Sequence, residues 1–411
     1  MVSAHAYPWD VLGGDPFFFD RAAQLEIESV TLAVAYHSTR AATPNHPSQR
    51  YVDAHYAALY RPVRAQVWRD RRLTPLPPQW MQDPDPALRA AELILRGNIG
   101  VNAWIVLAHN TRLGLTHPDL TVLNCFGERY PYALCPSQAE VRDHCATLAQ
   151  EALHDLPVTG VSLESVGQMG AVHLGCHEKT DGAYTQQALR ALSVCCCSAC
   201  TERWRDRGLS PIHALPALRA AATDPPAEGW TVYVPEFVPA AILEYPLSSA
   251  SSSSPPSSAG LAPGAGIPDE MAAIILASRH EAADELRGEV LQAVRQEAPG
   301  VPVTLHAHPD PWATGPSPGL TSAAAAEVDR LLVPCWPTTE ASAELIRQAT
   351  AHHGGVDAYV TALLPAIPDA LPEHGRRLRA AGATGLGLYH LGLVPSRHLN
   401  LLRQVAEQFQ A

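Results

Sequence analysis

The chain has 411 residues, 46% of them hydrophobic, and a formal net charge of −12 at neutral pH. This length can bury one large core or two ordinary ones. The acidic balance argues against a nucleic-acid partner, and no apolar run approaches the roughly 20 residues of a membrane-spanning helix. The first residues, MVSAHAYPWD, have no basic segment and no long apolar segment, so we expect no secretory signal.

The nine cysteines also bear on the compartment. Their number is odd, and Cys195, Cys196 and Cys197 are consecutive. This usage favours reduced thiols or a metal over a secreted disulfide framework. We therefore expect a cytoplasmic protein.

Short, almost continuously apolar segments recur along the chain, as expected for parallel strands that are buried on both faces. In chain order they are 30–37, 57–63, 101–110, 158–165, 301–308, 330–336, 358–364 and 385–390. The second is weaker, because Pro62 would interrupt a central strand. Helical periodicity occupies segments between and after them, at 85–96, 139–153, 269–298, 340–352, 370–381 and 396–410.

This alternation predicts an α/β fold, a (β/α)8 TIM barrel. An open doubly wound sheet is the competing fold, but no G-x-G-x-x-G motif follows the first strand. Residues 247–268 are rich in Ser, Pro, Gly and Ala and have too little apolar surface to order themselves. We expect them to form a disordered loop inside one domain that spans residues 1–411.

Glu164 ends the apolar segment 158–165, and parallel barrels place their chemistry at the carboxyl ends of strands. A glutamate there could equally cap a turn or pair with an arginine. Polar and aromatic residues also follow other strands, and a barrel brings these ends together. Such a set of rings and hydrogen-bonding groups suits a sugar. The candidate substrate-binding residues are Tyr36, His37, Arg40, His109, Asn110, Glu178, His306, His308, Trp336, Tyr389 and His390.

Cys195, Cys197 and Cys200 form a C-x-C-x-x-C motif, and Trp204 follows. Three thiolates at this spacing can wrap one tetrahedral zinc ion, and Cys135, Cys176 and His177 are candidates for the fourth ligand. The alternative is that the thiols only pack a tight turn. A zinc site of this kind would be structural, because it leaves no open position for catalysis.

The order of motifs is H-P-D-L at 117–120, an aromatic segment ending in C-P at 130–136, the strand ending in Glu164, and then the thiol motif. It resembles bacterial glycosyl-hydrolase-like TIM barrels, in particular hypothetical glycosyl-hydrolase families related to zinc-containing β-galactosidases. The motifs cover 101–204, and the likeness in architecture covers the whole chain. The resemblance implies that Glu164 is the acid/base at the end of the fourth strand.

Those families also place a glutamate nucleophile at the seventh strand. Here segment 358–364 is followed by no carboxylate until Asp369. Asp310, Glu178 and Asp181 are therefore the candidate partners of Glu164, and Asp310 is preferred because it directly follows a strand.

The sequence is compatible with three functions. The first is hydrolysis of a small-molecule glycoside without a catalytic cofactor, with Glu164 as general acid and Asp310 as nucleophile or base. The second is a metal-dependent hydrolase or isomerase, because His306 and His308 alternate and so point to one face of a strand. The third is a catalytically silent sugar-binding barrel, which applies if no carboxylate lies within roughly 10 Å of Glu164.

Overall fold

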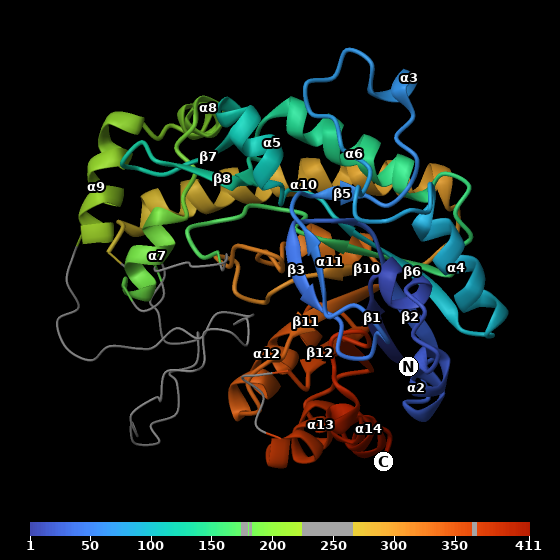
Figure 1. The fold of residues 1–411 in the computed structure, drawn as a ribbon. Helices are drawn as coiled ribbons and strands as arrows, with labels where there is room; N and C mark the ends of the chain where they lie inside the picture. Colours follow the sequence, from blue (N-terminus) through green and yellow to red (C-terminus); the bar gives the residue numbers. More distant parts are fainter. Residues whose placement is uncertain (174–179, 181–182, 224–265, 364–367) are drawn as a thin grey trace.

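The structure is a computed structural model that describes residues 1–173, 180, 183–223, 266–363 and 368–411. Eight parallel strands form a closed barrel, because β1 pairs with both β2 and β13 (Figure 1). In chain order they are β1 (Val2–Ala6), β2 (Ser29–Tyr36), β6 (Gly100–Val106), β9 (Gly160–Glu164), β10 (Val303–His306), β11 (Arg330–Pro334), β12 (Val356–Thr361) and β13 (Gly385–Tyr389). The predicted (β/α)8 barrel is confirmed.

One of the predicted strands is wrong. Segment 57–63 contributes only β5 (Ala58–Leu59), which pairs antiparallel with β2 at the edge of the barrel. The first barrel strand is instead β1, which the apolar pattern missed because Ser3 and His5 interrupt its five residues. The two errors cancel in the count, so Glu164 still ends the fourth barrel strand.

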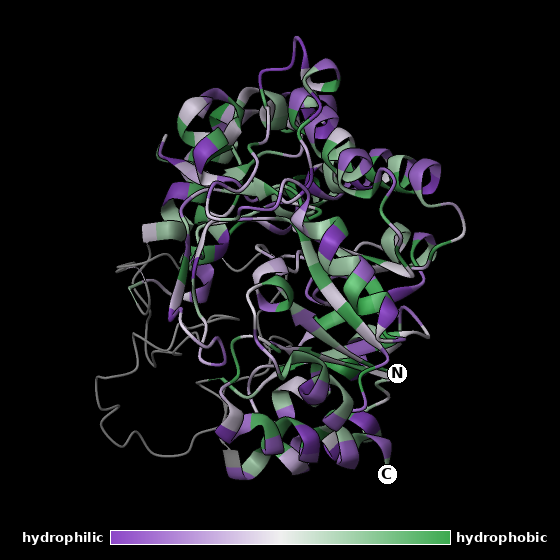
Figure 2. Ribbon diagram, turned by 45° about the vertical axis from the view of Figure 1, so that its right-hand side comes forward, coloured by the Kyte–Doolittle hydropathy of each residue, from purple (hydrophilic) through white to green (hydrophobic). Residues whose placement is uncertain are grey.

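The helices surround the strands, and Figure 2 shows hydrophobic residues concentrated on the central strands. The predicted helical segments correspond to α4 (Pro86–Arg96), α6 (Ala139–Leu153), α10 (Asp269–Glu297), α12 (Glu340–Thr350), α13 (Leu371–Ala380) and α14 (Ser396–Gln410). Shorter helices are α1 (Pro8–Leu12), α2 (Phe18–Gln24), α3 (Ala65–Trp68), α5 (Thr111–Thr116) and α11 (Ser322–Glu327), with 3-10 turns at Pro118–Leu120 and Pro368–Ala370. A hairpin, β3 (Thr39–Ala42) with β4 (Tyr51–Ala54), follows β2.

Two long excursions, after β6 and after β9, build a lobe beside the barrel. The lobe contains the hairpin of β7 (Thr121–Leu123) and β8 (Arg129–Leu134) and the helices α7 (Gln186–Leu192), α8 (Ser198–Asp206) and α9 (Pro211–Thr223). Its core contains the buried Trp204. Helix α10, about 43 Å long at 1.5 Å per residue, runs from this lobe along the barrel (Figure 1).

The predicted Ser/Pro-rich loop at 247–268 lies outside the described residues except for its last three. Of these, Ile267 is buried in the core of the lobe. That the loop interrupts a single domain stays a prediction. No helix in the described part of the chain is long and apolar enough to cross a membrane.

Candidate active site

An aromatic cluster fills the carboxyl ends of the barrel strands, and every member of it is buried. Within it the rings of Trp104 and His306 are stacked with centroids 6.4 Å apart, and those of His5 and Tyr359 lie 4.5 Å apart. The barrel mouth therefore presents flat rings and hydroxyl groups together. The cluster consists of His5, Tyr7, Tyr36, Trp104, His306, Tyr359 and Tyr389.

Glu164 lies inside this aromatic cluster and is itself buried. Its Oε2 accepts a hydrogen bond of 2.9 Å from Nε1 of Trp104 and lies 3.7 Å from Nδ1 of His306. The other ring nitrogen of His306 is 3.0 Å from Oγ of Ser162 on β9. The register of β9 against β10 therefore sets the distance between Glu164 and His306.

The protonation of this pair follows from burial. Burial raises the pKa of Glu164 to about 8, although the hydrogen bond from Trp104 acts in the opposite direction. Burial also lowers the pKa of His306 to about 3. At neutral pH Glu164 is therefore a carboxylic acid beside a neutral imidazole, so the contact is not an ion pair.

Three tyrosine hydroxyls meet near Glu164. The hydroxyl oxygens of Tyr7 and Tyr36 are 3.3 Å apart, and Tyr389 hydrogen-bonds to both. Burial raises the pKa of Tyr389 to about 12, and the charge of Glu164 adds to this effect. The tyrosines therefore stay protonated and can donate hydrogen bonds to a ligand.

The structure brings several of the predicted substrate-binding residues together. Tyr36, His306 and Tyr389 belong to the aromatic cluster, and Trp336 packs against it, with its ring 4.6 Å from Tyr359 and 5.6 Å from Tyr389. These residues come from four different strands or strand ends, so only barrel closure makes them neighbours.

His37 and His109 form a second group at the ends of β2 and β6. Their rings stack with centroids 4.5 Å apart, and Nε2 of His109 is 3.1 Å from Nε2 of His173. His173 in turn stacks on Tyr132 of β8 at 3.9 Å. Burial lowers the pKa of His37 and of His173 to about 4, so both are neutral imidazoles at neutral pH.

Two predicted binding residues have other contacts. Oδ1 of Asn110 accepts the backbone N–H of Leu113 at 3.0 Å and so caps α5. Arg40 lies on the exposed β3–β4 hairpin, with its guanidinium 5.1 Å from the ring centroid of Tyr51. No contact of the described residues joins either side chain to Glu164.

His390 directly follows β13 and is fully buried. Its ring stacks on Tyr7 at 4.2 Å, and its Nδ1 is 3.8 Å from Oδ2 of Asp10. Asp10 accepts the backbone N–H of Tyr7 at 2.8 Å, and burial raises the pKa of Asp10 to about 7. The apolar pattern of the sequence did not point to this carboxylate because it did not reveal β1.

Asp310 lies in the loop after β10, with different neighbours from Glu164. Its Oδ2 is 3.4 Å from Nη2 of Arg190, and its Oδ1 accepts the backbone N–H of Trp312 at 2.9 Å. Its own backbone N–H donates to Nδ1 of His308 at 3.0 Å. Within the described residues, no contact links Asp310 to Glu164.

Four members of the aromatic cluster were not predicted. His5 and Tyr7 lie on or directly after β1, whereas Trp104 and Tyr359 stand inside predicted strands. Alternation would normally separate inward from outward positions. It failed here because both faces of these strands are buried, so all their residues look alike in hydropathy.

Among the described residues, one group of His, Cys, Asp and Glu is close enough to hold a metal ion, and it consists of Cys135, Cys195, Cys197 and Cys200. The two histidines of the H-x-H motif, His306 and His308, belong to no such group. A catalytic metal on these histidines would therefore need ligands from outside the described residues.

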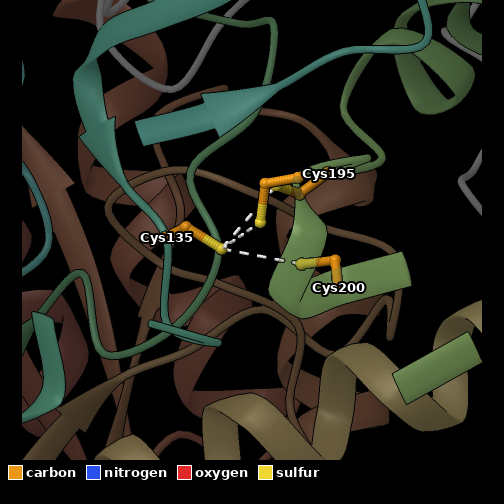
Figure 3. A group of neighbouring side chains, drawn as sticks. Cys135, Cys195 and Cys200 are labelled. Atoms are coloured by element: carbon orange, nitrogen blue, oxygen red, sulfur yellow. Dashed lines mark hydrogen bonds between the residues drawn. The ribbon is translucent and has the colours of Figure 1, made fainter. Parts of the chain in front are cut away.

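The four thiols come from two excursions. Cys135 follows β8, and the other three precede or begin α8 (Figure 3). Sγ of Cys135 is 3.6 Å from Sγ of Cys195, 3.8 Å from that of Cys197 and 3.6 Å from that of Cys200. A tetrahedral zinc with Zn–S bonds of about 2.3 Å separates its sulfurs by about 3.8 Å, so this donor set fits the ion.

Hydrogen bonds among the thiols shift their pKa values in opposite directions, and those of Cys135 and Cys200 are raised well above the ordinary value. Hydrogen bonds from Cys135, Cys195 and Cys200 lower the pKa of Cys197, and Nε2 of Gln138 donates to its sulfur at 3.6 Å. Of the three candidates for the fourth ligand, the structure brings Cys135 into place. The other two, Cys176 and His177, lie outside the described residues, as do the candidate carboxylates Glu178 and Asp181.

No protein-family model and no curated protein sequence matches this chain. Solved structures do match. The glycoside hydrolase domain of PgaB (BpsB) from Bordetella bronchiseptica has a TM-score of 0.56 at 14% identity, and the match covers 98% of each chain. The catalytic domain of β-amylase from Paenibacillus polymyxa has a TM-score of 0.53 at 11% identity, covering 98% of this chain and 97% of that one.

α-L-Fucosidase isoenzyme 2 from Paenibacillus thiaminolyticus has a TM-score of 0.55 at 12% identity, covering all of this chain and 49% of the fucosidase. This chain thus spans about half the length of that enzyme. At these identities the likeness concerns the fold. The chain has a barrel like those of glycoside hydrolases.

Proposed function

We propose that this protein hydrolyses a glycosidic bond, with Glu164 as the general acid. The observation that carries the proposal is the buried carboxyl group of Glu164, which keeps its proton up to about pH 8. A general acid must be protonated at the working pH so that it can protonate the leaving-group oxygen. The similarity in fold to glycoside hydrolases supports the same activity.

The proposed substrate is a small-molecule carbohydrate. The rings of Trp104 and Trp336 can stack on the apolar face of a sugar, and the hydroxyls of Tyr36 and Tyr389 can bond to its polar edge. His37 and His109 would contact the sugar or its leaving group farther from Glu164. No cofactor enters the proposed reaction.

The second carboxylate in the proposal is Asp310, acting as nucleophile or base. Hydrolysis by two carboxyl groups needs them about 5–5.5 Å apart for retention and about 6.5–9.5 Å apart for inversion. Asp310 is partly exposed, and its ion pair with Arg190 would have to open for the carboxylate to face the sugar. Asp10 is the alternative second carboxylate, since it lies beside His390, which stacks on Tyr7 of the aromatic cluster.

The test is turnover of a panel of chromogenic glycosides by wild type and by Glu164→Gln. We expect the variant to lose about 100- to 10,000-fold in rate, the usual contribution of a general acid. Glu340→Gln, an exposed residue at the start of α12, is the control and should keep wild-type activity. Equal rates for wild type and Glu164→Gln would refute the assignment of Glu164, whereas sugar binding without turnover by wild type would favour the silent barrel.

We also propose that Cys135, Cys195, Cys197 and Cys200 hold a structural zinc ion. The ion would tie the β7–β8 hairpin to the start of α8. Its four sulfur ligands leave no position for a substrate, so it would act on stability and not in the reaction.

A further inference from the structure

We infer that Arg279 is the counter-cation of the tetrathiolate centre, and this inference rests on the proposed zinc site. A zinc ion with four thiolate ligands carries a net charge of −2. All four cysteines are buried, so water cannot fully solvate that charge. A charge of this kind needs a nearby cation.

Arg279 is on α10 and is itself buried, with 9% exposure. Its Nη2 donates to the backbone carbonyl of Ala313, whereas its Nη1 is buried and has no hydrogen-bond partner. Among the described residues no carboxylate lies within ion-pair distance of it. Burial lowers the pKa of Arg279 to about 10, which still leaves the guanidinium charged at neutral pH.

A small cavity of about 10 Å³ connects Arg279 to the thiols. Its walls include Cys195, Cys200 and Arg279, together with Gln168 and Ser278. This is about the space that one water molecule needs. The guanidinium can therefore act on the thiolates across a single water. The charge of Asp310 attracts Arg279 without forming an ion pair, and Cys200 attracts it more weakly.

The other cations nearby are already neutralised. Arg203, which also lines the cavity, is paired with Glu281 at 2.9 Å and with Glu285. Arg190 is paired with Asp310. Among these cations, Arg279 is therefore the one whose positive charge has no ion-pair partner. The proposed zinc centre carries the excess negative charge that it can balance.

The experiment measures zinc affinity by competition with a chromophoric chelator, on the full chain. We expect Arg279→Met to weaken zinc binding by about 10- to 100-fold, the usual effect of losing a neighbour of a metal ligand. Arg279→Lys keeps the charge and should weaken binding by less than about tenfold. In urea unfolding, Arg279→Met should lower the free energy of unfolding more in the zinc-loaded protein than in the zinc-free protein.

Arg287→Met is the matched control. Arg287 lies on the same helix and is also buried, but it is paired with Asp284 at 2.8 Å and with Glu327 at 2.7 Å. Its loss should lower stability with and without zinc alike and leave zinc affinity unchanged. Wild-type affinity in Arg279→Met, or equal losses in the Met and Lys variants, would overturn the role of Arg279, whereas a wild type that binds no zinc would refute the zinc site itself.

Discussion

The indole Nε1 of Trp104 donates a 2.9 Å hydrogen bond to Oε2 of Glu164 in the interior of the barrel mouth. Glu164 ends β9, and Trp104 lies on the neighbouring strand β6, two residues before Val106, the register partner of Glu164. The bond favours the carboxylate, whereas burial favours the acid, and burial is the larger effect. Each of these two opposing influences can be tested.

Trp104→Phe should move the alkaline limit of activity to higher pH. The substitution removes the hydrogen bond that favours the charged form, so the pKa of Glu164 rises above its value of about 8. The measurement is the pH dependence of kcat/KM. Trp9→Phe is the control, because Nε1 of Trp9 has no partner among the described residues; an unmoved limit in Trp104→Phe would contradict the assignment.

Glu164 should also make the fold less stable as pH rises. Its pKa is about 8 in the folded protein against an ordinary 4.5, so the folded state binds more protons between these values. The contribution to the free energy of unfolding is therefore present at low pH and is lost as pH rises through this window, by up to about 5 kcal/mol. Glu164→Gln should lack this loss.

Urea unfolding of wild type and Glu164→Gln at several pH values between 4.5 and 8 measures the difference. As pH rises, the free energy of unfolding of wild type should fall relative to that of Glu164→Gln. Parallel curves would show that Glu164 is solvated and titrates normally.

Asp310→Asn should lower turnover by at least about 100-fold while leaving the free energy of unfolding within about 1 kcal/mol, because Asp310 is partly exposed. Asp10→Asn should instead weaken the cap of α1, at a cost of about 1 kcal/mol in stability. Turnover assays and urea unfolding of both variants compare the two carboxylates. Full activity in Asp310→Asn, together with loss of activity in Asp10→Asn, would assign the role of nucleophile or base to Asp10 instead.

Cys135→Ser should lose most of the zinc bound by wild type and should unfold at a lower temperature. Cys135 is the ligand that joins the β7–β8 hairpin to α8, so its loss separates the two excursions. Metal content by mass spectrometry and thermal unfolding measure this. Cys145→Ser is the control, since Cys145 is buried in α6 and belongs to no metal-binding group among the described residues.

The fold could be predicted because its strands are long apolar segments separated by helical periodicity. Glu164, Tyr36, His306, Trp336 and Tyr389 could be found because each stands where such a segment ends. The pattern failed at β1, whose five residues include Ser3 and His5. With β1 it also missed Tyr7 and Asp10, because the apolar signal of so short a strand is weak.

By itself, the sequence determined the strand-and-helix rhythm, the position of Glu164 at a strand end and the thiol spacing, because these are local properties of the chain. Only the tertiary structure decided which residues meet. Barrel closure puts Trp104 and His306 beside Glu164, and the packing of two excursions adds Cys135 to the thiols. The pKa of Glu164 is likewise a tertiary property, because burial by residues from several strands creates it.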